Sequence, residues 1–491
     1  MIRRQPHPKP SIVTKASHDN TSSTLPDHGA RRRMAKRVGL LTGLVALMTL
    51  GLWARGCAVP AGPRPNIIVI VVDTLRADHL GCYGYQRSTS PNVDRFAADA
   101  LLFERCLSHA PETRTSVAAI FSGFLPHETY VPALQRAPDG LEMLAEMLQS
   151  FGYQTLAVVS NYVLRRGYGF EQGFAVYDDK MDDFETIRPV PERIAEHTTG
   201  RAIELLEQHR DKPVFMWIHY QDPHGPYTPP PGYAAQFRDP DQPPRLLKLN
   251  DNWTGAGGIP DYQQRDDNRD YHDYVANYDG EIRYFDDHFK RLIDALKSLG
   301  MYDDSLIVLT ADHGEGMGEQ DYYFAHGEHL YASQTHVPLI MKYGEMLKGR
   351  RSDFVQHADL VPTILRMLEL DPNPAYPGRD LRQPMPAGRS IVSELHPGLP
   401  ERPTQYSIVV DGLKLIHGVD SKRYEFYNLA VDPYETKDLS DNKTYAPRMG
   451  KLKKKLARRA GEDRLGLRVE RREVVLTDEE KRKMRSLGYT Q

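Results

Sequence analysis

Three apolar runs of the chain break off into acidic residues and histidines, at Asp73, at Asp222 and His224, and at Asp312 and His313. Asp73 and Asp312 offer hard carboxylate oxygens and His313 offers an imidazole. This donor set suits one divalent metal ion, Mn2+, Ca2+, Mg2+ or Zn2+. A lone Asp after a strand is often only the N-cap of the next helix. Because the pattern recurs in distant segments, it favours one shared metal site over separate caps.

A second stretch that could do chemistry is SHAPETRTSVAAIFSGFLPH, residues 108–127, which has the form of a loop running into a helix. It contains no cysteine, and its hydroxyl groups include those of Ser108, Thr113 and Ser116. The first turn of a helix favours a developing negative charge, because unpaired N–H groups and the helix dipole face it. The residues alone leave open which hydroxyl attacks, if any does.

The elements that must position these residues indicate an α/β fold. The run NIIVIVVD at 66–73 is continuous, apolar and β-branched, as in a strand buried on both faces, and similar runs occupy 155–161, 213–222 and 305–315. Helix-like segments alternate with them, which predicts a doubly wound, mostly parallel sheet flanked by helices. Ligands bind such sheets beyond the carboxyl ends of the strands, so the acids and histidines should meet in one crevice.

Two further regions differ in composition from this pattern. Residues 225–270 are rich in Pro, Asp, Gly and Arg with little periodicity, which predicts a long surface insertion near the site. The C-terminal subdomain and tail, 396–491, are predicted to contain a small antiparallel sheet and a closing basic helix. The Lys and Arg residues at 451–459 indicate a solvated helix face, with an anionic membrane surface as the alternative partner.

The N-terminal segments predict export. Residues 1–37 carry nine Lys or Arg against two Asp and are predicted to form a disordered cytoplasmic arm. Residues 38–54 are uncharged and apolar, which predicts a transmembrane signal anchor with its basic flank inside. A linker at 55–65 leads to the predicted catalytic domain at 66–395. We therefore expect a single-pass protein of the cell membrane with this domain on the periplasmic or extracellular side.

Bulk composition gives the class of protein and excludes one kind of partner. The 491 residues are 40% hydrophobic and 26% charged, with a formal net charge of -3. These values are those of an ordinary globular chain. Because there is no overall basic excess, we expect no nucleic-acid partner.

Seven motifs follow one another over residues 66–440, namely NIIVIVVDTLRADHLGCYGY, TSPNVDRFAADALLFERC, YQDPHGPYTPP, LTADHGEGMGE, AHGEHLYASQTHVPLIM, HADLVPTIL and YEFYNLAVDPYETKDL. In this order they resemble the sulfatase family of the alkaline phosphatase superfamily. The resemblance implies an alkaline phosphatase/sulfatase-like fold and a metal-dependent enzyme acting on sulfate or phosphate esters. The implied partner is an anionic ester substrate, a sulfated or phosphorylated glycan or lipid head group.

The resemblance also implies a register for residues 108–127. Family members have Cys or Ser, then x-Pro-x-Arg, then an apolar helix that ends in Thr-Gly. With Gly123 as the anchor, Thr113 stands at the nucleophile position, Thr115 where Pro is usual and Val117 where Arg is usual. The family's formylglycine is made from Cys or Ser, so Thr113 implies a different nucleophile. Thr113 resembles the metal-bound Thr of the phosphoglycerol and phosphoethanolamine transferases of the superfamily. The resemblance implies that Thr113 is both the nucleophile and a metal ligand.

Two further residues gain roles from the resemblance, and Arg76 is a candidate because it lies three residues after Asp73. His224 in DPHGPY matches a substrate-oxygen ligand, and His326 in AHG matches a histidine that can protonate the leaving oxygen. Arg76 could offset substrate charge, or it could form an ion pair beside the site. A shifted register with Arg114 as the motif's Arg would put Ala110 at the nucleophile position and leave no nucleophile.

Two functions from different classes follow. The first is a membrane-anchored, metal-dependent hydrolase or transferase acting on sulfate or phosphate esters through Thr113. The second is a non-catalytic module that uses the crevice to bind an anionic glycan or lipid head group. The absence of the motif's Pro and Arg favours this second function. The intact triad of Asp73, Asp312 and His313 favours the enzyme.

Overall fold

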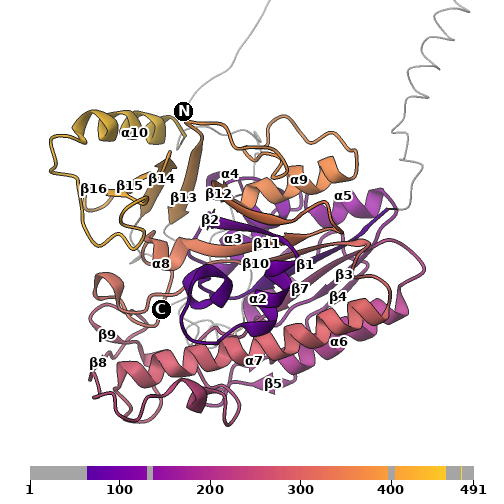
Figure 1. Ribbon diagram of the computed structural model, residues 1–491, viewed down its shortest axis with the longest axis horizontal. Helices are drawn as coiled ribbons and strands as arrows, with labels where there is room; N and C mark the ends of the chain where they lie inside the picture. Colours follow the sequence, from indigo (N-terminus) through magenta and orange to yellow (C-terminus); the bar gives the residue numbers. More distant parts are fainter. Residues whose placement is uncertain (1–63, 130–135, 396–403, 460–476, 478–491) are drawn as a thin grey trace, which may run out of the picture. The chain divides into compact units, whose positions relative to one another are not determined.

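The computed structural model describes residues 64–129, 136–395, 404–459 and 477. Its central element is an eight-stranded sheet (Figure 1) whose strands lie in the order β12 (Gly349–Gln356), β2 (Leu101–Leu107), β11 (His336–Lys342), β10 (Ser305–Ala311), β1 (Asn66–Val72), β7 (Val214–Tyr220), β3 (Gln154–Val158) and β4 (Val176–Asp178). Neighbouring strands are parallel, except that β11 is antiparallel to both β10 and β2. The predicted doubly wound, mostly parallel sheet is confirmed.

Helices cover both faces of this sheet (Figure 1). One group consists of α2 (Pro91–Ala98), α6 (Ala195–Gln208) and α7 (Tyr271–Ser298), and the other of α3 (Thr113–Ser122), α5 (Leu144–Ser150) and α9 (Leu360–Met367). The short helices α4 (Pro126–Thr129) and α8 (Ala332–Thr335) lie in the connections after α3 and before β11. Because both faces are covered, Ile67 to Val72 of β1 are all buried. Each such side chain contributes about 2 kcal/mol by leaving water.

A second, smaller sheet forms the C-terminal part of the described chain. Its four antiparallel strands are β13 (Ser390–Leu395), β14 (Gln405–Val410), β15 (Leu413–Gly418) and β16 (Arg423–Asn428). Helix α10 (Ala446–Arg459) closes one face, with Leu452 and Leu456 packed against Ile408, Leu415 and Phe426. The predicted antiparallel sheet and closing helix are confirmed.

The predicted insertion after β7 is built from short elements. They are η4 (Ala234–Phe237), β8 (Lys248–Leu249), β9 (Gly258–Ile259) and η5 (Asp261–Gln263), and a small hairpin of β5 (Asp183–Phe184) and β6 (Pro191–Glu192) lies earlier in the chain. Tyr262 and Gln263 donate hydrogen bonds to the carbonyl oxygen of Phe324, at 3.0 and 3.1 Å. The insertion is therefore attached to the loop that follows β10.

The predicted membrane location is corrected. In the part of the chain that the structure describes, no helix is both long enough and apolar enough to cross a bilayer. The single-pass protein with its membrane partner, predicted from residues 38–54, is unsupported. That segment lies outside the described residues, and its 17 positions are fewer than the roughly 20 that a spanning helix needs.

Candidate active site

The predicted metal ligands lie at the carboxyl ends of two adjacent strands. Asp73 follows β1 and the Asp312–His313 pair follows β10, and these strands are paired in parallel from Asn66 opposite Ser305 onward. All three side chains are fully buried. One ligand atom from each lies within 4.8 Å of the others. The structure therefore brings together the triad that the sequence predicted.

Two carboxylate oxygens of this triad form no hydrogen bond within the described residues. Asp73 Oδ1 and Asp312 Oδ2 are buried without a partner, and they lie 3.8 and 3.6 Å from Nε2 of His313. The other oxygen of each carboxylate forms a hydrogen bond. Asp73 Oδ2 accepts one from Asn161 Nδ2 at 2.6 Å, and Asp312 Oδ1 accepts one from the His313 backbone N–H at 2.8 Å. Two unsatisfied oxygens and an imidazole nitrogen facing one point are the donors of a divalent cation site.

The electrostatics of the triad agree with this fit. Burial raises the pKa of Asp73 well above its usual value, and the neighbouring Asp312 raises it further. Burial is also the main cause that raises the pKa of Asp312. Two carboxylates this close resist simultaneous ionisation. A bound cation would relieve that repulsion.

The backbone around the triad is constrained. Thr74 has a φ of 55°, which is rare for a β-branched residue, and its N–H donates to Asp312 Oδ1 at 3.2 Å. Gly314 lies so close to Ser333 that a Cβ at this position would be 2.2 Å from the Ser333 carbonyl oxygen. The carbonyl oxygen of Gly314 accepts from Nδ1 of His313 at 2.9 Å, which directs Nε2 towards the carboxylates.

Thr113 is the first residue of α3, and its hydroxyl faces the triad. The side chain is fully buried, and Oγ1 lies 3.3 Å from Nε2 of His313. The nearby hydroxyl lowers the pKa of both Asp73 and Asp312, against the larger effect of burial. Gly123 ends the helix in the left-handed region with φ 75°, where the resemblance placed its anchor.

The hydroxyls of Ser116 and Ser108 are engaged with backbone carbonyl groups. Ser116 Oγ donates to the carbonyl oxygen of Asp312 at 2.6 Å, and Ser108 Oγ donates to that of Ala110 at 3.1 Å. The Arg114 guanidinium, buried, stacks over the ring of Tyr168 at 4.3 Å. Of the hydroxyls of Ser108, Thr113 and Ser116, that of Thr113 is the one that contacts a side chain of the triad.

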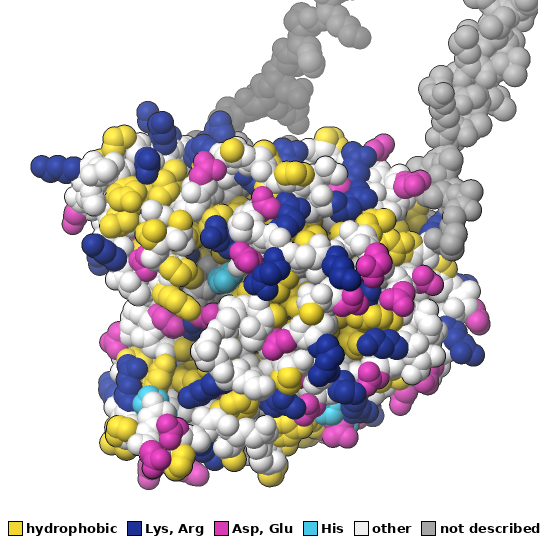
Figure 2. All heavy atoms as spheres, in the orientation of Figure 1, with side chains coloured by type: hydrophobic (Ala, Val, Ile, Leu, Met, Phe, Trp, Pro, Cys, Tyr) yellow, Lys and Arg dark blue, Asp and Glu magenta, His cyan; other side chains and the backbone are white. Residues whose placement is uncertain are grey.

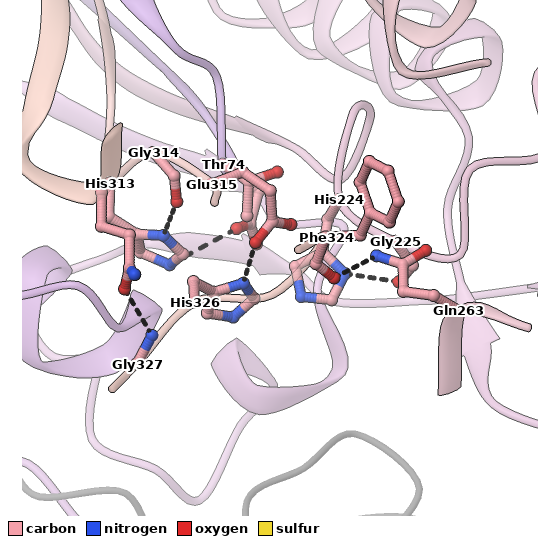
Figure 3. Close-up of polar contacts among 12 residues, drawn as sticks. Thr74, His224, Gly225, Gln263, His313, Gly314, Glu315, Phe324, His326 and Gly327 are labelled. Carbon is pink, nitrogen blue, oxygen red and sulfur yellow. Dashed lines mark hydrogen bonds and ion pairs between the residues drawn. The ribbon is translucent and has the colours of Figure 1, made fainter. Parts of the chain in front are cut away.

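His326 lies between His313 and His224, as Figure 3 shows, with ring centroids 4.5 and 5.2 Å away. Its Nδ1 is 3.1 Å from Oε1 of Glu315, a fully buried carboxyl that also accepts from Tyr227 OH at 3.0 Å. His224 Nδ1 donates to the carbonyl oxygen of Gly225 at 2.7 Å. Its buried Nε2 has no hydrogen-bond partner among the described residues, and burial lowers the pKa of this imidazole well below its usual value.

Arg76 takes the ion-pair alternative. Its guanidinium lies 2.8 Å from Asp78 and 2.7 Å from Glu319, and it donates to the carbonyl oxygen of Glu315 at 3.0 Å. The residue is 3% exposed. Arg76 therefore ties the loop after β1 to the loop after β10, and its predicted role in offsetting substrate charge stays a prediction.

Sequence reasoning missed part of the site. Glu315 and Tyr227 were not assigned roles, although Glu315 follows the metal-ligand pair by two residues and Tyr227 follows His224 by three. Asn161, at the end of the β3 segment, holds Asp73, and a second imidazole, that of His219, lies 3.8 Å from the same carboxylate. For Glu315 and Tyr227, closeness in sequence to the predicted site residues was the available signal, whereas Asn161 and His219 were recognisable from the sequence as residues at the ends of strands.

With this geometry in place, comparison with known proteins identifies the family. The sulfatase profile matches residues 65–370, and that of the C-terminal region of N-sulphoglucosamine sulphohydrolase matches 318–462. The first match covers more than half of the chain. The chain belongs to the sulfatase family, and the family predicted from its motifs is confirmed.

Individual relatives share about a quarter or less of their residues with this chain. The chain is 24% identical to the N-acetylglucosamine-6-O-sulfatase of Bacteroides thetaiotaomicron, over 79% of this chain and 85% of the relative. Among solved structures, a protein in complex with its substrate D-glucosamine-2-N,6-O-disulfate matches with a TM-score of 0.69 and 20% identity, over 82% of this chain and all of the other. The phosphonate monoester hydrolase of Agrobacterium radiobacter matches with a TM-score of 0.65 and 20% identity, over 81% and 96%. These relatives are sulfatases and ester hydrolases, and the chain is a sulfatase-like ester hydrolase.

Proposed function

We propose that this chain hydrolyses sulfate or phosphate-type esters with Thr113 as the nucleophile. The observation that carries the proposal is the position of Thr113 Oγ1, 3.3 Å from His313 Nε2 at the first residue of α3. Here the hydroxyl adjoins the unsatisfied oxygens of Asp73 and Asp312, and the helix N–H groups favour developing negative charge.

Asp73, Asp312, His313 and the Thr113 hydroxyl would hold a divalent cation. When bound, such a cation supplies Lewis-acid chemistry that lowers the pKa of a coordinated hydroxyl and polarises an ester oxygen. The residues fit it because two buried carboxylate oxygens otherwise have no partner. Asn161 and the His313 N–H orient these carboxylates from behind.

The protein's own residues divide the remaining work. Thr113 Oγ forms a bond to the sulfur or phosphorus as the bond to the ester oxygen breaks, and its proton passes to a neighbouring carboxylate. His326 donates a proton to the departing ester oxygen and takes one from the water that then cleaves the Thr113 ester. Glu315 orients His326 through Nδ1, and His224 lies beside it to contact an oxygen of the anion.

The relatives support the substrate class. The glucosamine sulfatase and the protein bound to glucosamine disulfate act on sulfated amino sugars, and the Agrobacterium enzyme acts on a phosphonate monoester. We propose an anionic ester on a sugar as the substrate. An aryl sulfate, a phosphate monoester, a phosphate diester and a phosphonate monoester, tested side by side, identify the ester type.

Thr113→Ala tests the nucleophile. Turnover should fall by up to about a million-fold, as for loss of a covalent nucleophile elsewhere. Metal content and melting temperature should change little, because Asp73, Asp312 and His313 remain. Ser116→Ala is the matched control and should retain turnover. Activity of Thr113→Ala within tenfold of the parent would exclude Thr113, and so would a covalent adduct found by mass spectrometry on any other residue.

A further inference from the structure

Helix α10 carries an unusually dense positive charge. Its 14 residues contain seven Lys or Arg and no Asp or Glu, in a chain whose net charge is -3. At about 100° per residue, six of the seven fall within an arc of roughly 140° on the helix surface. These six residues, which we call the basic arc, are Arg448, Lys451, Lys454, Lys455, Arg458 and Arg459.

Four of the six charges in this arc are not neutralised by carboxylates of the described residues. Arg448, Lys451 and Lys454 are exposed, and in the described ranges neither they nor Lys455 form an ion pair with a carboxylate. Lys455 Nζ donates only to the carbonyl oxygen of Gly388, at 2.8 Å. In Figure 2, dark blue side chains gather at the upper left, where Figure 1 places α10. The surface therefore attracts anions.

The apolar side of α10 is already occupied. Leu452 and Leu456 are 5% and 4% exposed and pack into the core of the small sheet. A membrane-surface helix must insert its apolar side into the lipid, so the packing of these leucines disfavours a bilayer as partner. The basic arc also contains no aromatic side chain, whereas proteins that bind single-stranded nucleic acids stack bases on aromatic rings.

We propose that the basic arc binds a sulfated polysaccharide, the polymeric form of the substrate. The inference rests on the proposed function, because it takes its substrate class from there. Successive basic side chains three or four residues apart advance about 4.5 to 6 Å along the axis, and the helix is about 21 Å long. This row matches a linear polyanion with repeated sulfate groups. A polymer held there would stay near the enzyme between successive cleavages.

The test measures binding of fluorescent dextran sulfate to the full chain by anisotropy, at 0.05 and 0.3 M salt. The triple variant Arg448→Gln, Lys451→Gln and Lys454→Gln should bind dextran sulfate at least about tenfold more weakly at the lower salt concentration. Its binding should also depend less on salt, because fewer counterions are released. Turnover of a small aryl ester should not change, because Arg448, Lys451 and Lys454 lie on α10, which packs on the small sheet, whereas Thr113 lies on α3 beside the large sheet.

A matched control removes the same charge elsewhere, through Arg210→Gln, Lys212→Gln and Lys248→Gln. These three residues are exposed and form no ion pair with another described residue. Equal loss of dextran sulfate binding in this control would overturn the assignment to α10. Tighter binding of the parent to anionic lipid vesicles or to an oligonucleotide would overturn the glycan as partner. If dextran sulfate binds through α10 while no ester is hydrolysed, the binding surface is supported and the proposed function is wrong. If esters are hydrolysed but dextran sulfate does not bind, only the surface fails.

Discussion

Two groups of buried carboxyls in this protein differ in how their negative charge is balanced. In the metal triad, Asp73 and Asp312 point oxygens without partners at one imidazole nitrogen. In the second group, which we call the acid pair, Asp222 follows β7 and Glu281 lies on α7, and each side chain shifts the pKa of the other. Glu281 accepts from the N–H of Thr228 at 2.8 Å.

The difference lies in what each group needs for electrical balance. Burial raises the pKa of Asp222 to about 7 and that of Glu281 well above its usual range, so a shared proton satisfies the acid pair. The triad's oxygens do not reach each other in this way, and they surround a point also reached by an imidazole and a hydroxyl. Burial of acids alone therefore does not make a metal site. Convergence of unsatisfied oxygens does.

The largest effect is expected for Asp312→Asn, which removes the charge but keeps the shape. Metal affinity should fall by more than about a hundredfold. Mutation of residues that only hydrogen-bond to a metal ligand already lowers metal affinity about 10- to 100-fold, and Asp312 is itself a predicted ligand. Elemental analysis after dialysis measures this, with turnover as the second readout. Full metal content together with full activity would exclude Asp312 as a ligand.

An intermediate effect is expected for Glu315→Gln, because Glu315 lies next to the triad but contacts His326 and Tyr227. If it positions His326 as the proton donor, kcat should fall about tenfold to a hundredfold for esters with poor leaving groups. Esters of acidic phenols, which leave without a proton, should lose less than about threefold. Equal loss for both kinds of ester would indicate a structural role only.

The smallest effect is expected for Glu281→Gln, the match to Asp312→Asn within the acid pair. A carboxyl that is protonated in the folded state is nearly equivalent to an amide, so metal content should not change and turnover should stay within about threefold. A tenfold loss of either would remove the distinction between the two groups.

The acid pair also predicts a pH dependence of stability. Raised pKa values mean that the folded state holds protons that the unfolded state releases, so this contribution is complete below pH 4 and is lost as pH rises towards 7 and above. The melting temperature of the metal-loaded protein should fall over this range. Glu281→Gln should make the fall shallower, and an unchanged slope would contradict the shared proton.

The central fold was predictable because its strands carry strong local signals. The apolar runs ending at Asp73 and Asp312 are buried on both faces, and their carboxyl ends had to converge. β12 was not predictable, because GRRSDFVQ lies at the edge of the sheet with half-exposed side chains and no apolar alternation. β13 was missed for another reason. The predicted C-terminal subdomain begins at residue 396, whereas the small sheet already begins with β13 at Ser390.

The metal triad was predictable and its surroundings were not. A sequence shows that Asp73 and Asp312 end strands, but which oxygen is held by Asn161 and which remains unsatisfied depends on tertiary geometry. The ion pair of Arg76 with Glu319 joins segments about 240 positions apart, and no local pattern encodes such a contact. The register of Thr113 came from the family resemblance, since the stretch itself offers several hydroxyls.

The placement of β1 between β10 and β7 has a consequence for synthesis of the protein. β1 can pair with β7 once Val214–Tyr220 has been made, but its other neighbour begins only at Ser305, since Asn66 pairs with Ser305. Until then its apolar side chains lack their final neighbours. Such distant pairing slows folding and exposes unfinished chains to aggregation. The nascent chain should therefore bind chaperones until β10 emerges, and the catalytic crevice should be among the last parts to form.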